Sequence, residues 1–214
     1  MKYTDFDDFL DESPRGNTIS VITEIDPTKL KAENLDLENE ELPILPLRGM
    51  MLFPSTLLPV NIGRQSSLQL LHDASRQDGY IGVFSQTDDS IENPTMEHLY
   101  KVGVLARVMK ILELPDNTKT ALLQGLQRIT LIEAHDGGRY LMGKTAGNPE
   151  TVPSNRDREF SAVVAACREA AEKFIHAGGI HNIDTSFNLK SMSDKAFLIN
   201  FICANIPIAN RERI

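Results

Sequence analysis

The sequence predicts an α+β fold in which a β-rich region comes first and a helical region follows. Between Glu41 and about Pro149, short apolar runs are separated by turn-forming residues, which is typical of strands and hairpins. Past Pro153 the apolar residues recur at helical spacing instead. We therefore expect an acidic leader (1–41), a β domain (42–150) and a helical subdomain (151–214).

The leader differs from the rest of the chain in charge. Residues 1–41 carry 12 acidic and 4 basic side chains, a net charge of −8, whereas the remaining 173 residues carry 18 of each. Such a leader is typical of a solvated, flexible tail, although "TISVITEID" (18–26) could pair as an edge strand. The remaining residues carry no net charge. The sequence therefore argues against nucleic-acid binding, because phosphate recognition depends on an excess of Lys and Arg.

The composition is that of a protein without a membrane anchor. Hydrophobic residues make up 41% of the 214 residues, and no apolar run approaches the roughly 18 residues of a membrane helix. The first residues are acidic, unlike a secretory signal peptide. Two cysteines, Cys167 and Cys203, are too few for a disulfide framework. We expect a cytoplasmic protein in which both thiols are buried and inert.

The first part of the β domain predicts short strands around one helix. Three prolines interrupt "ELPILPLRGMMLFP", which favours edge strands and bends over helix. Further strands are expected at "LLPVNIG" and "YIGVFSQ", with a single helical turn at "TMEHLY". Between the two strands, Leu68, Leu71 and Ala74 share one side of a predicted helix that covers 66–77.

The second part, 102–146, predicts three or four long strands that turn at 115–117 and at 136–138. It contains a full match to the phosphate-loop pattern, formed by Gly138, Gly143, Lys144 and Thr145. A phosphate loop requires a helix directly after it, whose N-terminus holds the phosphates. Prolines at 149 and 153 exclude that helix, so we interpret the match as a hairpin without nucleotide binding.

The helical region predicts two helices and the start of a third. Ser154 with Asp157 resembles a capping box before the first helix, which Gly178 and Gly179 end. Its apolar stripe consists of Phe160, Val163, Val164, Cys167, Ala170, Ala171, Phe174 and Ile175. A second helix is expected from Ser193, with Phe197, Leu198, Phe201 and Ile202 on one face. Because a helix that starts at Asn210 would have only four residues, we expect the chain to be part of a longer polypeptide.

The sequence contains no pattern that indicates a catalytic or metal site. The five histidines form no i, i+4 pair around a glutamate and do not neighbour a cysteine at ligand spacing. No serine lies in a strand-turn-helix elbow. We therefore expect neither catalysis nor a cofactor in this chain.

Two stretches, "LPILPLRGMMLFPSTLLPVNIGR" (42–64) and "EHLYKVGVLARVMKILELPDNTKTALLQGLQRI" (97–129), resemble the N-terminal domain of the ATP-dependent Lon protease family. The matching features are Leu42-Pro43, Leu45-Pro46-Leu47-Arg48, Phe53-Pro54, Pro59, Gly63-Arg64, Leu99-Tyr100, Val102-Gly103, Ala106-Arg107, Leu114-Pro115-Asp116, Gly125 and Arg128. The resemblance covers 42 to about 145 well and the helices more loosely.

This resemblance implies a PUA-like β pseudo-barrel over 42–150 and a helical region that leads toward an ATPase. The family's full-length protein is a hexameric ring with an ATP- and magnesium-dependent motor and a serine–lysine peptidase, so both activities would lie beyond this chain. The chain itself would recognise unfolded or damaged protein substrates and aid ring assembly. An alternative is a stand-alone PUA-like protein that binds RNA or a small ligand.

The strand around 104–114 suggests where substrates would bind. Val104, Ala106, Val108, Leu112 and Leu114 fall on one side by simple alternation, and Leu105, Met109 and Ile111 fall on the other. A domain of about 110 residues can rarely bury both faces of such a strand, so one face is expected to meet a partner. The predicted substrate-binding residues are Pro59, Met109, Ile111, Leu112, Leu114 and Pro115. Each of them could instead lie in the core.

Overall fold

The computed structural model describes residues 41–77, 79–113, 118–154, 156–179, 189, 192–206 and 210–212. The acidic leader before Glu41, with its possible strand at 18–26, lies outside the described residues. The strands are β1 (Glu41–Leu47), β2 (Leu57–Asn61), β3 (Tyr80–Ser85), β4 (Val102–Glu113), β5 (Lys119–Asp136) and β6 (Leu141–Gly147). The helical elements are α2 (Gln65–Gln77), η1 (Met96–His98), α3 (Arg158–Phe174), a π-helical turn η2 (Ile175–Gly179), α5 (Lys195–Asn205) and η3 (Asn210–Glu212). The predicted α+β class is confirmed.

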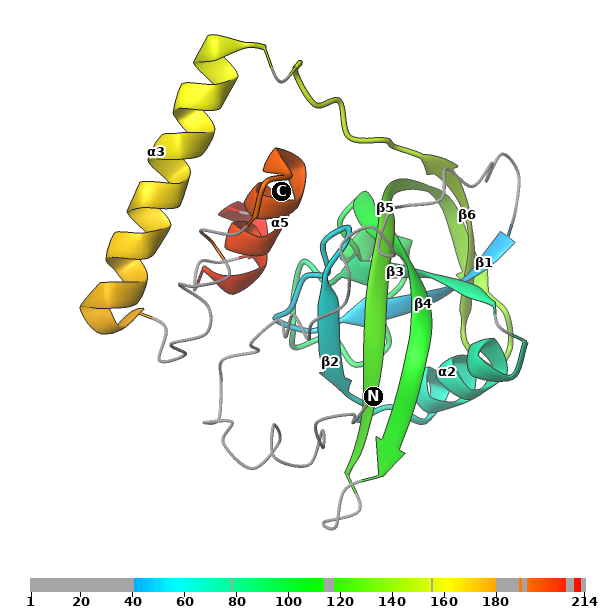
Figure 1. The fold of residues 1–214 in the computed structure, drawn as a ribbon. Helices are drawn as coiled ribbons and strands as arrows, with labels where there is room; N and C mark the ends of the chain where they lie inside the picture. Colours follow the sequence, from blue (N-terminus) through cyan, green and yellow to red (C-terminus); the bar gives the residue numbers. More distant parts are fainter. Residues whose placement is uncertain are drawn as a thin grey trace.

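Strands β5, β4, β3, β1 and β6 pair in this order, and the pairing of β6 with β5 closes them into a barrel (Figure 1). The long strand β5 pairs with β4 on one side and, through its C-terminal half, with β6 on the other. The ring is completed by β4 with β3, β3 with β1, and β1 with β6. Strand β2 adds to the N-terminal half of β5. The β1–β3 pair is parallel and the other pairs are antiparallel.

Each face of this sheet has its own apolar core, since successive side chains of a strand point to opposite faces. One cluster receives partly or fully buried residues from all five barrel strands and therefore fills the barrel: Leu42, Ile44, Phe84, Leu105, Leu126, Ile129, Leu131 and Leu141. The other lies outside the barrel, beneath α2 and β2, and includes Leu45, Leu47, Leu58, Val60, Leu70, Leu71, Val83, Val104, Ala106 and Leu123. The barrel wall is thus buried on both sides.

Two glycines make this close packing possible. A Cβ on Gly103 would lie 2.4 Å from a ring carbon of Phe84, inside the barrel. A Cβ on Gly125 would lie 2.1 Å from the carbonyl oxygen of Phe53, where the loop before β2 crosses β5. The same loop is tied to β5 by two backbone hydrogen bonds of 2.9 Å, from Ser55 N to Gly125 O and from Gly125 N to Thr56 O.

The expectation that the first proline-containing run is an edge strand is wrong. Strand β1 lies between β3 and β6 in the sheet. It tolerates Pro43 and Pro46 because its two halves pair with different neighbours: 41–43 pair with β6 and 44–47 with β3. Each proline therefore has a ladder partner on one side of the strand only, as in an edge strand.

The two long helices form a third core, which contains no strand residue. It consists of Val164, Ile175, Leu189, Met192, Phe197, Leu198, Phe201 and Ile202, with Phe160, Ala171, Ile199 and Ile206 packed against it. In Figure 1, α5 lies between α3 and the barrel. None of the described helices is long and apolar enough to cross a membrane.

The helices begin later than the sequence indicated. The N-cap of α3 is Asp157, whose side chain accepts a hydrogen bond from Phe160 N at 3.0 Å, and not Ser154. Ser154 instead accepts hydrogen bonds from Arg156 N and Asp157 N, which form a turn before the cap. Likewise α5 is capped by Asp194, which accepts from Phe197 N, rather than starting at Ser193.

The apolar stripe of α3 is wider than the surface that covers it. Val164 is buried, but Val163 is 55% exposed and Phe174 is 38% exposed. The expectation of a buried Cys167 is wrong, since this residue is exposed, and Cys203 on α5 is half-buried. Among the described residues, α5 packs against one strip of α3 and leaves the edges of the stripe uncovered.

Candidate functional site

The far ends of β4 and β5, with β2 on the other side of β5, form a ribbon that extends beyond the barrel (Figure 1). Strand β3 pairs with β4 only from Val104 to Arg107, so 108–113 pair with β5 alone. Four of the predicted substrate-binding residues lie here or beside it: Met109, Ile111 and Leu112 on β4, and Pro59 on the neighbouring β2. Leu114 and Pro115 lie outside the described residues.

A β-bulge at Met109 decides which of these side chains are accessible. Val108 pairs with Leu123 and Lys110 with Leu122, so Met109 is an extra residue in β4, and its side chain is 48% exposed. Because the bulge inverts the alternation, Ile111 pairs with Ala121 and packs against the outer core. The prediction that Ile111 shares the face of Met109 is therefore wrong.

The other half-buried apolar residues lie across the three neighbouring strands. Pro59 pairs with Leu122, which in turn pairs with Lys110. This row faces away from the core, because the residues on either side of Pro59, Leu58 and Val60, belong to the outer core cluster. We call the surface formed by Pro59, Met109, Leu112 and Leu122 the ribbon surface; Leu122 was not among the predicted residues, although its alternation with Ala121 and Leu123 could have indicated it.

A second exposed apolar side chain also belongs to a bulge. Leu131 pairs with Thr145 and Glu133 with Lys144, so Ile132 is extra in the β5–β6 ladder and is 51% exposed. The sequence did not single out this residue, because a bulge leaves no mark in an otherwise regular apolar pattern.

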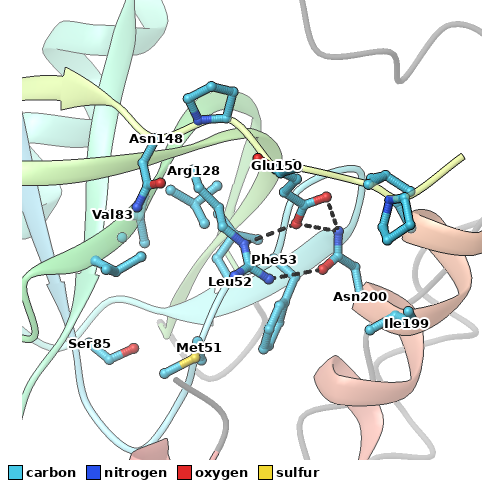
Figure 2. A pocket seen from close by; sticks show the side chains of 18 of the residues that line it. Met51, Leu52, Phe53, Val83, Ser85, Arg128, Asn148, Glu150, Ile199 and Asn200 are labelled. Carbon is cyan, nitrogen blue, oxygen red and sulfur yellow. Dashed lines mark hydrogen bonds and ion pairs between the residues drawn. The ribbon is translucent and has the colours of Figure 1, made fainter. Parts of the chain in front are cut away.

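Where the barrel meets the helices, the structure has a cleft of about 470 Å³. Figure 2 shows Met51, Leu52 and Phe53 on the barrel side, with Ile199 and Asn200 of α5 across from them. The linker between β6 and α3 forms part of the wall through residues 148–153. The lining contains apolar and polar side chains, and three of the polar ones, Arg128, Glu150 and Asn200, lie close together.

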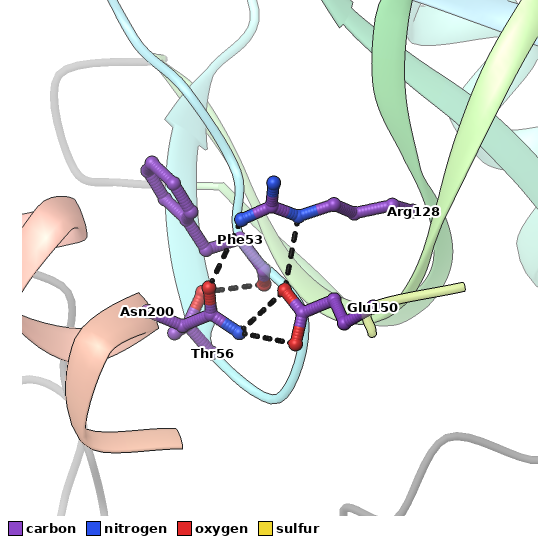
Figure 3. A network of polar contacts seen from close by, with 5 residues as sticks. All are labelled: Phe53, Thr56, Arg128, Glu150 and Asn200. Atoms are coloured by element: carbon purple, nitrogen blue, oxygen red, sulfur yellow. Dashed lines mark hydrogen bonds and ion pairs between the residues drawn. The ribbon is translucent and has the colours of Figure 1, made fainter. Parts of the chain in front are cut away.

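Three of those polar side chains are mutually hydrogen-bonded (Figure 3). Arg128 Nε lies 2.9 Å from Glu150 Oε1, and an Arg128 terminal nitrogen donates to Asn200 Oδ1 at 3.3 Å. Asn200 Nδ2 donates to Glu150 Oε1 at 3.0 Å and to Oε2 at 3.2 Å. Arg128 comes from β5, Glu150 from the linker and Asn200 from α5, so the contacts join the barrel, the linker and the helices.

Arg64, directly before α2, is held by hydrogen bonds to other parts of the protein. Its guanidinium donates to Pro46 O at 3.4 Å, to Gln86 Oε1 and to Ile91 O at 3.2 Å, which connects β1, the residue after β3 and the loop at Ile91. Burial, with a further contribution from Arg48, lowers the pKa of Arg64 below its usual value. Since the contacts are backbone carbonyls and an amide of the protein itself, we assign Arg64 to the architecture.

The phosphate-loop match is a hairpin, as predicted. Asp136 Oδ1 accepts a hydrogen bond from Gly138 N at 2.8 Å in the turn, and Gly138 has a positive φ of 84°. Lys144 lies on β6 and is 3.7 Å from Glu133 of β5, while Thr145 is buried in the same strand. Among the described residues, no three His, Cys, Asp or Glu side chains are grouped to hold a metal ion.

Comparison with known proteins gives the same relationship from both sequence and structure. The sequence model of the ATP-dependent protease La (LON) substrate-binding domain matches residues 41–214. The chain is 36% identical over 208 residues to the Lon protease of Parabacteroides distasonis, which covers 97% of this chain and 25% of that protein. It is 34% identical over 190 residues to the Lon protease of Porphyromonas gingivalis, covering 88% and 22%. The chain thus spans about a quarter of the length of these relatives.

Two solved structures share the fold. The N-terminal domain of a Mycobacterium avium complex Lon protease superposes with a TM-score of 0.63 at 12% identity, covering 81% of this chain and 87% of that one. A Lon N-terminal domain protein from Xanthomonas campestris gives 0.57 at 15% identity, with the same coverage. With its barrel, its helical extension and a family match over most of its length, this chain belongs to the substrate-binding domain family of the ATP-dependent Lon (La) proteases.

Proposed function

We propose that this chain recruits unfolded or damaged proteins to a Lon-type protease through the ribbon surface. The observation that carries the proposal is the 48% exposure of Met109 at a bulge, next to half-buried Leu112 on the same strand. Unfolded chains expose apolar side chains that folded proteins bury, and apolar contact is non-directional. Such a surface can therefore bind many sequences weakly, and the flexible thioether of methionine suits varied partners.

The remaining predicted residues fit this proposal in different ways. Ile111 packs beneath the surface and supports it from the core side. Leu114 and Pro115 lie outside the described residues, and we propose that they too contact substrate. Pro59 contributes from β2, across Leu122.

The ATPase and peptidase activities belong, in this proposal, to the parts of the protein that this chain does not span. ATP, magnesium and a serine–lysine dyad would act there, in a hexameric ring in the cytoplasm, and this domain would contribute to assembly of the ring. Nucleic acid is not the expected partner, because the residues after 41 carry no net charge.

Binding of a labelled, permanently unfolded protein, measured by fluorescence anisotropy, tests the ribbon surface. Burying one methionine side chain stabilises a complex by about 1.5–3 kcal/mol, so Met109→Glu should weaken binding by about tenfold or more. Ile132→Glu is the matched control, since Ile132 is a similarly exposed apolar residue at another bulge. It should leave the affinity unchanged.

Two results would contradict this placement. Equal losses in the two variants would mean that exposed apolar area in general, rather than the ribbon, determines binding. An affinity that falls steeply with salt would indicate a charge-driven partner such as RNA instead. A wild-type chain without affinity for unfolded protein would contradict the function itself.

A further inference from the structure

The contacts that join the barrel to the helical pair differ from the contacts that hold each of these parts together. Both have apolar cores of their own, and the helical core includes no strand residue. Between them lies the cleft of about 470 Å³ instead of a shared core. Parts of a chain that lack a large apolar interface are expected to move relative to one another.

Two polar connections between described residues cross this junction. Arg128, Glu150 and Asn200 form a closed triangle in which each member is bonded to the other two. A second tie is longer: Asn210 of η3 donates to Met50 O at 3.4 Å. The triangle is therefore the stronger of these two polar connections between the helices and the barrel.

Asn200 is an unusual residue for its position. It is only 3% exposed, on a helix whose other buried residues are Phe197, Leu198, Phe201, Ile202 and Ala204. A buried amide without partners would destabilise the protein, and asparagine is a poor helix former. Here both ends of the amide are satisfied, the oxygen by Arg128 and the nitrogen by Glu150. A buried asparagine at this position is explained if its amide connects the helices to the barrel.

We propose that Arg128, Glu150 and Asn200 act as a latch that fixes the orientation of the helical pair relative to the barrel and so sets the width of the cleft. Glu150 lies in the linker between Pro149 and Pro153, which restrict the backbone on either side of it. Releasing the carboxylate frees α5 and the linker together, and the helices then rotate about residues 148–154. The latch acts whether or not a client protein is bound.

The width of the junction can be measured by double electron–electron resonance between spin labels. Ile132→Cys on β5 and Val163→Cys on α3 are exposed attachment points, in a chain that also carries Cys167→Ser and Cys203→Ala. With the latch intact we expect one narrow distance distribution. Glu150→Gln, which weakens the bond to Arg128, and Asn200→Ala, which removes the amide, should each abolish the narrow peak and give a broad distribution.

A charge exchange distinguishes a latch from a general loss of stability. In the double variant Arg128→Glu with Glu150→Arg, the Asn200 amide can rotate by 180° and offer its nitrogen to the new carboxylate and its oxygen to the new guanidinium. The narrow peak should therefore return. Glu133→Gln is the matched control, because it removes a partner of the exposed Lys144 on the barrel, away from the junction. It should leave the distribution unchanged.

Three outcomes would overturn the proposal: a distribution that is already broad in the wild type, a narrow one that survives Glu150→Gln, or a charge exchange that stays broad. Circular dichroism checks that each variant is folded. Glu150→Gln keeps the test valid if Asn200→Ala is unfolded, because the Glu150 side chain is 25% exposed and belongs to none of the three cores.

Discussion

The barrel and the helical pair differ in how completely they bury their apolar side chains. The barrel wall is covered on both faces, from within by its own side chains and from outside by α2 and β2. The helices share a single core, and α3 leaves Val163 and Phe174 largely uncovered. Among the described strands, the large exposed apolar residues are Met109 and Ile132, and both are the extra residues of bulges.

This difference shows two separate origins for an exposed apolar side chain. In a two-sided sheet, exposure requires a break in the ladder, so each exposed position is fixed by a local backbone feature. On a helix, exposure follows whenever the apolar stripe is wider than the partner. Exposure of the first kind is confined to a single residue, whereas exposure of the second kind extends along a whole edge of the helix.

The largest loss of stability is expected from a substitution for which the barrel wall, packed on both faces, has no space. In Gly125→Ala the new methyl group would lie 2.1 Å from Phe53 O, and this atom belongs to backbone that is itself hydrogen-bonded to Gly125. Overpacking of this kind costs about 1–3 kcal/mol, occasionally more, and we expect the upper end because backbone must move. Urea unfolding followed by circular dichroism would measure the loss.

The control for this prediction is another strand glycine. A Cβ on Gly147, the last residue of β6, would have nothing within 4 Å. Gly147→Ala should therefore leave stability unchanged or raise it by about 0.4–1 kcal/mol, because alanine lowers the conformational entropy of the unfolded chain. Similar losses in both variants would mean that glycine in these strands matters for flexibility and not for the close approach of the Phe53 loop.

Much of the fold could be predicted from the sequence because its signals are local. Proline and glycine positions, two-residue alternation and helical spacing gave the strands, α2, the β5–β6 hairpin and both long helices. Three of the Lon-like motif residues are architectural: Gly103 and Gly125 permit close packing, and Arg64 connects β1 to the segments around Gln86 and Ile91. These roles explain why the resemblance indicated the fold well.

The site could be predicted only in part, because its features are not local. A bulge at Met109 inverts the faces of β4, so simple alternation placed Ile111 on the wrong side. Arg128 and Asn200 are 72 residues apart, and neither lies in a recognisable motif with the other. Whether such residues meet depends on how the helices dock on the barrel, which no periodicity reveals.

An intermediate effect is expected at the start of α3, in the helical pair. Replacing an N-cap aspartate by alanine costs about 0.5–2 kcal/mol, so Asp157→Ala should lower the melting temperature clearly. Ser154→Ala removes only the hydrogen bond from Arg156 N to the serine hydroxyl, leaves the backbone bond from Asp157 N in place, and should have a smaller effect. Thermal melts of the two variants compare them directly; a larger loss for Ser154→Ala would restore the serine as the functional cap.

The smallest effect is expected on the uncovered side of α3, where Lys173 lies 2.6 Å from Glu169 one turn earlier. The hydrogen bond and the charge of Lys173 lower the pKa of Glu169 below its usual value of 4.5. Because the folded pKa is the lower one, the pair stabilises the protein above pH 4.5, and this contribution is lost as the pH falls through the folded pKa. Lys173→Gln should thus lower the melting temperature slightly at pH 7 in low salt, and the difference should vanish both in high salt and in acid that protonates Glu169 in the folded protein. A difference that persisted in acid would show that the aliphatic stem of Lys173, and not its charge, stabilises this exposed part of the helix.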